Sequence, residues 1–253
     1  MNSFSYLIDT IEDLAKEPFG YDINDLDKSD WRSISGFDSL SPNFIRTNHE
    51  KLFWSELIES QSLTEELIDE FSHYITRRTD WDQIIRNYNE LSKEFIIKYQ
   101  NKFIIDSLFE YQKVPFTLMK KYMVKNPYEA YELILNHQKL TTKVLKLFED
   151  FDVIDWLEVS KGDLTLLAME EFSNELYWNV ISEHRNLKES SIRKFKDKVS
   201  WKEISKYQKM SKEFILEFSN YVDIEYLKQN RLINQQELKE NETFTLLSLL
   251  QTM

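Results

Sequence analysis

The stretch SWKEISKYQKMSKEFI at residues 200–215 returns in altered form as DWRSISGFDSLSPNFI at residues 30–45. Both copies contain a Trp, an Ile-Ser pair shortly after it, a second Ser, and then a Phe-Ile pair. Related copies recur every 22–27 residues along the chain, a period typical of proteins built from stacked supersecondary units. The anchors, one for each copy, are Trp31, Trp54, Trp81, Ile105, Tyr131, Trp156, Trp178, Trp201 and Ile224.

Each copy predicts two short helices. In the second half, apolar residues such as Phe214, Ile215, Phe218 and Val222 fall on one stripe of a helix, whereas a strand would alternate every two residues. Asp, Ser and Thr residues stand where helix N-caps are expected. We predict caps for the first helix at Asp30, Asp80, Asp155, Ser200 and Asp223, and for the second at Ser41, Thr64, Ser92, Thr141 and Ser211.

A single hairpin of this size cannot bury both of its apolar stripes, so the copies are expected to stack on one another. The predicted fold is therefore all-α, an α-solenoid of about eight to nine stacked helical hairpins with terminal capping helices. We expect an acidic N-terminal capping helix (residues 4–15) and linker within residues 1–29, the repeat array at 30–241, and a C-terminal capping helix at 242–253.

The composition narrows the class of protein. Only three glycines and four prolines occur, which leaves little material for β-hairpins or glycine-rich phosphate loops. There is no cysteine, in keeping with a reducing compartment, and no apolar stretch approaches the length of a membrane span. We therefore expect a cytoplasmic protein that does not enter a membrane.

No pattern of catalytic residues stands out. The four histidines are scattered, and none of the common nucleophile, phosphate-loop or dinucleotide motifs is present. We expect a protein that is not an enzyme and that uses no cofactor and no metal.

The six tryptophans could form a base-stacking surface or a repeated core position. Surfaces that bind single-stranded nucleic acid interleave aromatic rings with Lys and Arg, whereas acidic residues such as Asp30 and Asp80 precede these rings. The core interpretation is favoured.

The seventh residue after the anchor is usually polar and is expected in the turn between the two helices. Such residues could satisfy backbone groups of the turns, or they could form an edge that contacts a partner. The members are Asp38, Gln61, Gln112, Gln138, Arg185, Gln208 and Arg231.

Acidic residues concentrate at the N-terminus and contribute half of the net charge of −12. A field of this sign repels nucleic-acid phosphates and attracts basic protein surfaces. The candidate contact patch consists of Asp9, Glu12, Asp13, Asp22, Asp25 and Asp27.

The pattern Trp-x-x-Ile-Ser followed by Leu-Ser-x-x-Phe-Ile resembles the short helical repeats found in bacteriophage and giant-virus proteins. In the first copy it is carried by Trp31, Ile34, Ser35, Leu40, Ser41, Phe44 and Ile45. The resemblance implies helical packing and a viral origin, and with it a location in the host cytoplasm.

The expected function is binding of another protein along an extended face, with no direct contact to nucleic acid. If the chain is viral, the partner is expected to be a host defence factor that the protein inhibits. Two alternatives stay open: an acidic mimic of nucleic acid that blocks a host nucleic-acid-binding protein, and a structural or assembly component.

Overall fold

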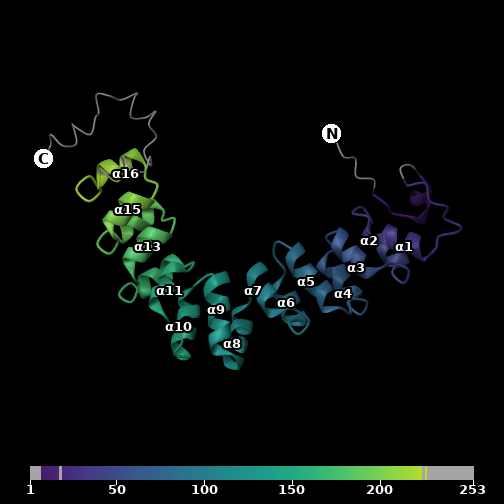
Figure 1. Ribbon diagram of the computed structural model, residues 1–253, viewed down its shortest axis with the longest axis horizontal. Helices are drawn as coiled ribbons and strands as arrows, with labels where there is room; N and C mark the ends of the chain where they lie inside the picture. The colour runs from purple at the N-terminus through teal and green to yellow at the C-terminus, as the bar shows by residue number, and fades with distance from the viewer. Residues whose placement is uncertain (1–6, 17–18, 224–225, 227–253) are drawn as a thin grey trace, which may run out of the picture. The chain divides into compact units, whose positions relative to one another are not determined.

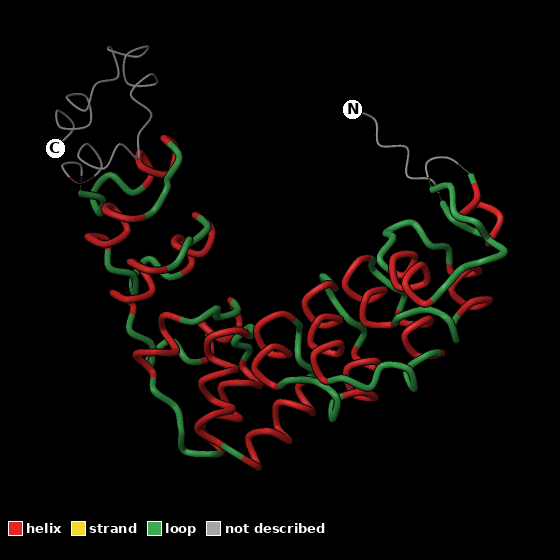
Figure 2. The backbone as a smooth tube through the Cα atoms, turned by 45° about the vertical axis from the view of Figure 1, so that its right-hand side comes forward, coloured by secondary structure: helices red, strands yellow, loops and turns green. Residues whose placement is uncertain are grey.

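The computed structural model describes residues 7–16, 19–223 and 226, and over these residues the protein consists of sixteen α-helices and one 3₁₀ helix. Helices and loops alternate along this part of the chain, which contains two isolated backbone bridges and no strand (Figure 2). The expected all-α fold is confirmed. Ile224, Arg231 and the capping helix expected at 242–253 lie outside the described residues.

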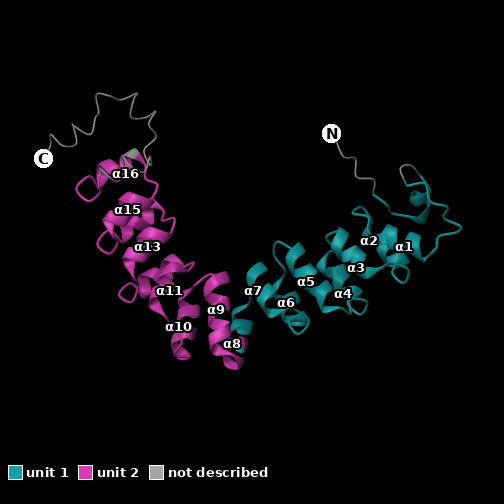
Figure 3. Cartoon of the chain, in the orientation of Figure 1, with its two compact units in different colours: residues 1–121 teal, residues 122–253 magenta. Residues whose placement is uncertain are grey.

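The chain divides into two compact units, Met1–Lys121 and Tyr122–Met253 (Figure 3). Consecutive helices pair into hairpins, and we name the first helix of each hairpin helix A and the second helix B. The helices that begin in unit 1 are η1 (Ile11–Ala15), α1 (Lys28–Ser35), α2 (Pro42–Asn48), α3 (Trp54–Ser60), α4 (Glu65–Glu70), α5 (Arg78–Asn87), α6 (Lys93–Tyr99), α7 (Ile105–Tyr111) and α8 (Phe116–Lys125). Those that begin in unit 2 are α9 (Pro127–His137), α10 (Thr142–Asp150), α11 (Trp156–Lys161), α12 (Leu166–Glu171), α13 (Trp178–His184), α14 (Glu189–Lys194), α15 (Trp201–Tyr207) and α16 (Lys212–Glu217).

Hydroxyl side chains start most of the B helices, as the sequence predicts. The Ser41 hydroxyl accepts a hydrogen bond from Phe44 N at 3.0 Å, and Thr64 accepts one from Leu67 N at 3.2 Å. Such a cap satisfies one of the amide groups that the first turn of a helix leaves without a partner. The same bond is made at Ser92, Thr141, Thr165 and Ser211.

Two of the predicted caps of A helices are wrong. Helix α1 begins earlier than expected, with Asp27 as the N-cap, while Asp30 lies inside the first turn and accepts a bond from Asp27 N. Asp80 lies inside α5 because that helix already begins at Arg78, and its carboxylate instead binds the guanidinium of Arg77. Asp155 does cap α11 as predicted. Ser200 is the N-cap residue of α15, but its side chain makes no capping hydrogen bond.

The core follows the repeat. The apolar residue three positions after the anchor is fully or almost fully buried in every described hairpin, and the first residues of the B helices bury an apolar pair in most of them. In six hairpins the anchor ring also packs on an aromatic ring near the end of helix B, with ring centroids 4.6–5.1 Å apart. The anchors thus belong mainly to the core, with Ile105, Trp156 and Trp201 partly exposed.

Neighbouring hairpins stack within each unit. In unit 1, α1, α3, α5 and α7 pack against one another in chain order, and in unit 2 α11, α13 and α15 do the same (Figure 1). On the other side of the hairpins, α10 packs against α12. This is the arrangement of a helical-repeat protein, in which each hairpin contacts the next.

The N-terminal segment differs from the continuous helix expected at residues 4–15, of which residues 7–15 are described. Ile8 is extended and fully buried, and its backbone bonds to Ser39 O and Ser41 N, both at 2.8 Å. Leu140 makes the same pair of bonds to the turn of the following hairpin in unit 2. Ile8 therefore plays the role that Leu140, in the turn of its own hairpin, plays toward the next hairpin, and this pairing requires an extended backbone. Of the described residues in this segment, Ile11–Ala15 form a 3₁₀ helix.

Candidate functional site

Five residues of the predicted polar edge end A helices, whereas Asp38 lies in the turn two residues beyond Gly36, the C-cap of α1. Gln61, Gln112, Gln138, Arg185 and Gln208 are the C-caps of α3, α7, α9, α13 and α15. The structure therefore places them at the turn between the two helices, as the spacing predicts.

The side chains of Gln112, Arg185 and Gln208 reach back to the turn of the preceding hairpin. Gln112 Nε2 donates to Ile85 O at 2.7 Å and Tyr88 O at 2.8 Å, while its Oε1 accepts from Leu91 N at 2.7 Å. Gln208 repeats this geometry in unit 2, donating to Ser182 O at 2.8 Å and accepting from Leu187 N at 2.9 Å. Each amide thus satisfies backbone groups of another hairpin.

Arg185 uses charge for the same purpose. Its guanidinium donates to the carbonyl oxygens of Gly162 and Leu164, and it contacts the carboxylate of Asp163. Burial lowers the pKa of Arg185, and the neighbouring Asp163 carboxylate opposes this change. The guanidinium remains the charged donor at neutral pH.

The polar residues that end the A helices thus form a ladder of side chains, and these bonds give the ladder a structural role between hairpins. Gln208 is only 2% exposed, and Gln112 and Gln138 are also buried. The amides of Gln112 and Gln208 already bind the protein itself, so these residues are not the contact with a partner.

A second ladder was missed by the sequence reasoning. Four hairpins have Ser directly after the buried aliphatic residue of helix A, and in each the hydroxyl donates to the backbone oxygen of the anchor at 2.6–2.7 Å. The same hydroxyl accepts the amide N–H that precedes the next anchor, at 2.8–3.0 Å. The four residues are Ser35, Ser160, Ser182 and Ser205.

Gln61 departs from the ladder. Its Nε2 and the hydroxyl of Tyr88 are buried without a hydrogen-bond partner, and both line a narrow crevice between α3 and α5. Burial raises the pKa of the Tyr88 hydroxyl well above its ordinary value, and the nearby Glu65 carboxylate adds to the effect.

Most residues of the predicted acidic patch are engaged locally. Asp9 accepts from the Ser41 hydroxyl, Asp22 from Asn24 N, and Asp27 caps α1. Asp13 accepts from Lys16 and from the backbone at Thr10, and these bonds hold its pKa well below the usual range. Glu12 and Asp25 are exposed.

Beyond the N-terminus, many acidic side chains pair with cations of the adjacent hairpin. Arg32 binds Glu56 at 2.6 Å and Arg46 binds Glu70 at 2.9 Å in unit 1. In unit 2 the carboxylates of Glu170, Glu171 and Glu217 bind Lys194, Lys146 and Arg193. Acidic and basic groups are thus interleaved along the B helices.

Large apolar side chains remain exposed at positions where the repeats differ. Leu167 on α12 is 70% exposed and its neighbour Leu166 is 43% exposed. These residues open a B helix, and the first two residues of α4, α6 and α14 are polar or charged. The Leu166–Leu167 pair is therefore specific to one hairpin and serves no repeated contact.

Among the residues that the structure describes, no group of three or more His, Cys, Asp or Glu side chains is placed to hold a metal ion. None of the helices in the same part of the chain is both long and apolar enough to cross a membrane. No protein-family model matches the chain, and neither a curated protein nor a solved structure is detectably similar to it.

Proposed function

We propose that this helical-repeat protein is not an enzyme and binds another protein through side chains that differ between the hairpins. The observation that carries the proposal is the exposed Leu166–Leu167 pair on α12. Burying a leucine side chain stabilises a complex by about 1.5–3 kcal/mol. Exposed apolar residues that no contact between hairpins uses are candidates for interface anchors.

The proposed partner therefore presents an apolar surface to α12. The resemblance to phage and giant-virus repeats is the sole source of the narrower proposal that the partner is a host defence protein, met in the host cytoplasm and inhibited by binding. Charge counts against the nucleic-acid mimic, because a mimic needs a continuous acidic face. Cations instead pair with acids on three B helices, namely Glu70, Glu170, Glu171 and Glu217.

The test exchanges the pair for residues that another hairpin already uses. The double variant Leu166→Lys/Leu167→Glu gives α12 the first two residues of α16, Lys212 and Glu213. Quantitative capture from host lysate should recover a defined partner with the wild-type protein and lose it with this variant. The control Lys93→Glu/Glu94→Lys exchanges exposed charges at the same positions of α6 and should retain the partner.

Capture that is unchanged by the α12 exchange would contradict the proposal. Light scattering provides a second arm, because a structural or assembly component would associate with itself. If the apparent molar mass of the wild-type protein rises with concentration and that of the α12 variant does not, the leucine pair serves self-assembly instead.

A further inference from the structure

The first hairpin lacks a ring that six other hairpins contain. There, an aromatic residue 16–18 positions after the anchor packs on the anchor ring. The corresponding residue after Trp31 is Asn48, whose amide donates to Phe44 O at 3.0 Å within its own helix. In the described part of the chain, the one aromatic ring that lies against Trp31 is that of Phe44, with ring centroids 6.4 Å apart.

A second ring is also missing beside Trp31. In the next hairpin Tyr74 stacks on Trp54 with ring centroids 5.5 Å apart, and in unit 2 Tyr221 packs on Trp201 at 5.0 Å. The corresponding residue of the first hairpin is Lys51, whose ammonium lies 5.0 Å from the centre of the Trp31 ring. Among the described residues, Trp31 therefore lacks the two rings that pack at these positions on Trp54 and on Trp201.

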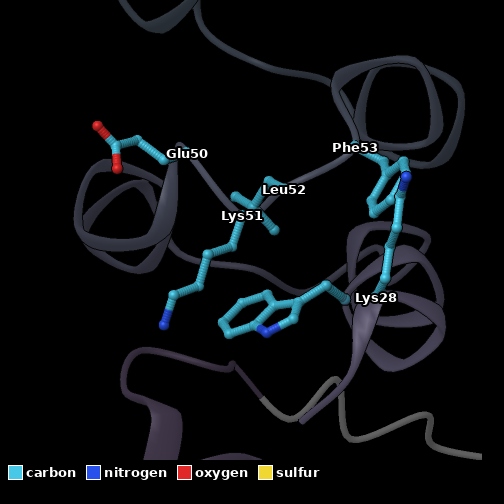
Figure 4. A pocket seen from close by; sticks show the side chains of 6 residues that line it. Lys28, Glu50, Lys51, Leu52 and Phe53 are labelled. Atoms are coloured by element: carbon cyan, nitrogen blue, oxygen red, sulfur yellow. The ribbon is translucent and has the colours of Figure 1, made fainter.

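A hollow of about 390 Å³ lies at this place, lined by Lys28, Trp31, Glu50, Lys51, Leu52 and Phe53 (Figure 4). Its size falls within the range of about 300–1,000 Å³ typical of small-ligand sites. The walls are an indole, a phenyl ring and a leucine, which suits the body of an aromatic side chain.

The rim of the hollow is basic. Among the described residues, neither Lys28 nor Lys51 has a carboxylate within salt-bridge distance. Figure 4 shows Glu50 turning its carboxylate away from the other labelled side chains. A carboxylate next to an inserted ring would therefore meet an ammonium group without displacing an existing ion pair.

The indole N–H of Trp31 differs from those of four other tryptophans. Trp54, Trp81, Trp178 and Trp201 donate Nε1 to a carbonyl of the preceding hairpin at 2.8–3.2 Å. Among the described residues, neither Trp31 nor Trp156 makes such a bond, and no described hairpin precedes Trp31.

From the missing rings, the hollow and its basic rim, we infer that the pocket beside Trp31 binds an aromatic side chain of a partner protein, next to an Asp or Glu of the same segment. This inference rests on the proposed function only in that a protein supplies the ring. The pocket lies within unit 1 and is tested with a peptide, whereas the α12 contact is tested by capture of a partner. A negative result for one proposal therefore leaves the other standing.

The probe is N-acetyl-aspartyl-phenylalaninamide, added to the full-length protein labelled with ¹⁵N at its indole groups. The Trp31 signal is assigned with Trp31→Phe. We expect the phenylalanine peptide to shift the Trp31 signal until the site is saturated. N-acetyl-aspartyl-leucinamide, which lacks the ring, should leave the Trp31 signal almost unchanged. With N-acetyl-asparaginyl-phenylalaninamide we expect affinity about two- to fivefold weaker, the loss typical of one exposed ion pair.

Two variants fill the pocket with rings that other hairpins already use. Asn48→Phe restores the residue found as Phe71 in the next hairpin, and Lys51→Tyr restores the one found as Tyr74. Both should remain folded by circular dichroism and weaken peptide binding by about tenfold or more, because the ring site is then occupied. Asn48→Ala leaves the pocket open and should bind the peptide as the wild type does.

Three results would overturn the inference. The first is a wild-type protein whose Trp31 signal does not respond to the phenylalanine peptide. The second is an equal response to the leucine peptide or in both ring-filling variants. The third is peptide binding that emerges only in Phe4→Ala/Tyr6→Ala, which would mean that a ring of the chain's own N-terminus fills the pocket.

Discussion

The hydroxyl of Ser182 accepts the backbone N–H of Ser200 at 3.0 Å and donates to Trp178 O at 2.6 Å. One buried side chain thus joins helix A of its own hairpin to the start of the next helix A. Ser35, Ser160 and Ser205 make the same pair of bonds. The Ser of the Trp-x-x-Ile-Ser pattern therefore couples neighbouring hairpins.

Ser182→Ala should destabilise the protein by about 1–3 kcal/mol, since the Ser200 amide is left without its partner in a partly buried place. Chemical unfolding followed by circular dichroism measures the change. The matched control is Ser190→Ala on the exposed face of α14, expected to change the free energy of unfolding by less than about 0.5 kcal/mol. Equal effects of the two substitutions would contradict the coupling role.

Gln112→Glu should be more harmful than its small change in shape suggests. The carboxylate cannot donate to Ile85 O or Tyr88 O, and it places a charge among buried carbonyl groups. We expect a loss of about 3 kcal/mol or more at pH 7.

The Gln112→Glu variant should regain part of the lost stability at low pH. Burial raises the pKa of the introduced carboxyl above its unfolded-state value, so the folded variant holds the proton more tightly and gains stability as the pH falls. The test is the difference in unfolding free energy between the variant and the wild type from pH 7 to pH 5. A difference that does not change with pH would contradict the buried position of this group.

Asp69 should contribute to stability at neutral pH and lose that contribution in acid. Hydrogen bonds from Lys98 and Tyr99 hold the Asp69 pKa below its ordinary value. The contribution is therefore present above the unfolded-state pKa of about 4 and is lost as the pH falls through the lower folded-state value. Because the pair is partly exposed, we expect less than about 1 kcal/mol.

Comparison of the wild type with Asp69→Asn isolates this contribution. The stability difference between them should shrink between pH 5 and pH 3, and it should also shrink in 1 M salt. Asp25→Asn removes an exposed carboxylate of the same unit and serves as the control. A difference for Asp69→Asn that persists at pH 3 would show that the ion pair is not its source.

Asn48→Phe should stabilise the protein, which is unusual for a single substitution. An aromatic pair contributes about 0.5–1.5 kcal/mol beyond the area that it buries, and the new ring would meet Trp31 as Phe71 meets Trp54. Thermal unfolding should show a higher midpoint than for either the wild type or Asn48→Ala. A lower midpoint than that of Asn48→Ala would mean that the hollow does not accept a ring in this position.

Much of the architecture follows from the repeat in the sequence. The buried pair Phe214–Ile215 and the cap at Ser211 lie as the apolar stripe and the hydroxyl predict, because each depends on local helix geometry. The cap proposed at Asp30 fails because Asp27, three residues earlier, supplies the acceptor for the first turn of α1. The cap proposed at Asp80 fails because α5 already begins at Arg78, and the Asp80 carboxylate accepts from Arg77 instead.

Contacts between hairpins were harder to predict. The ladder of Gln112 and Gln208 was one of two open interpretations, since spacing cannot say whether an amide turns inward or outward. The role of Ser182 was missed, although a Ser beside a buried aliphatic residue in helix A is a signal of bonding back along the helix. The pocket beside Trp31 also left a sequence signal, namely Lys51 where the hairpins of Trp54 and Trp201 have Tyr74 and Tyr221.

The central claim is that residues shared by the repeats bind the hairpins to one another and leave the differing residues for partners. Native-state hydrogen exchange of the loop amides of Leu91, Leu187 and Ser200 tests this claim most directly, because each donates to a side chain of the next or preceding hairpin. We predict slow exchange for all three, with Ser182→Ala accelerating Ser200 alone among them. Exchange of these amides at the rate of unprotected loop residues would contradict the account.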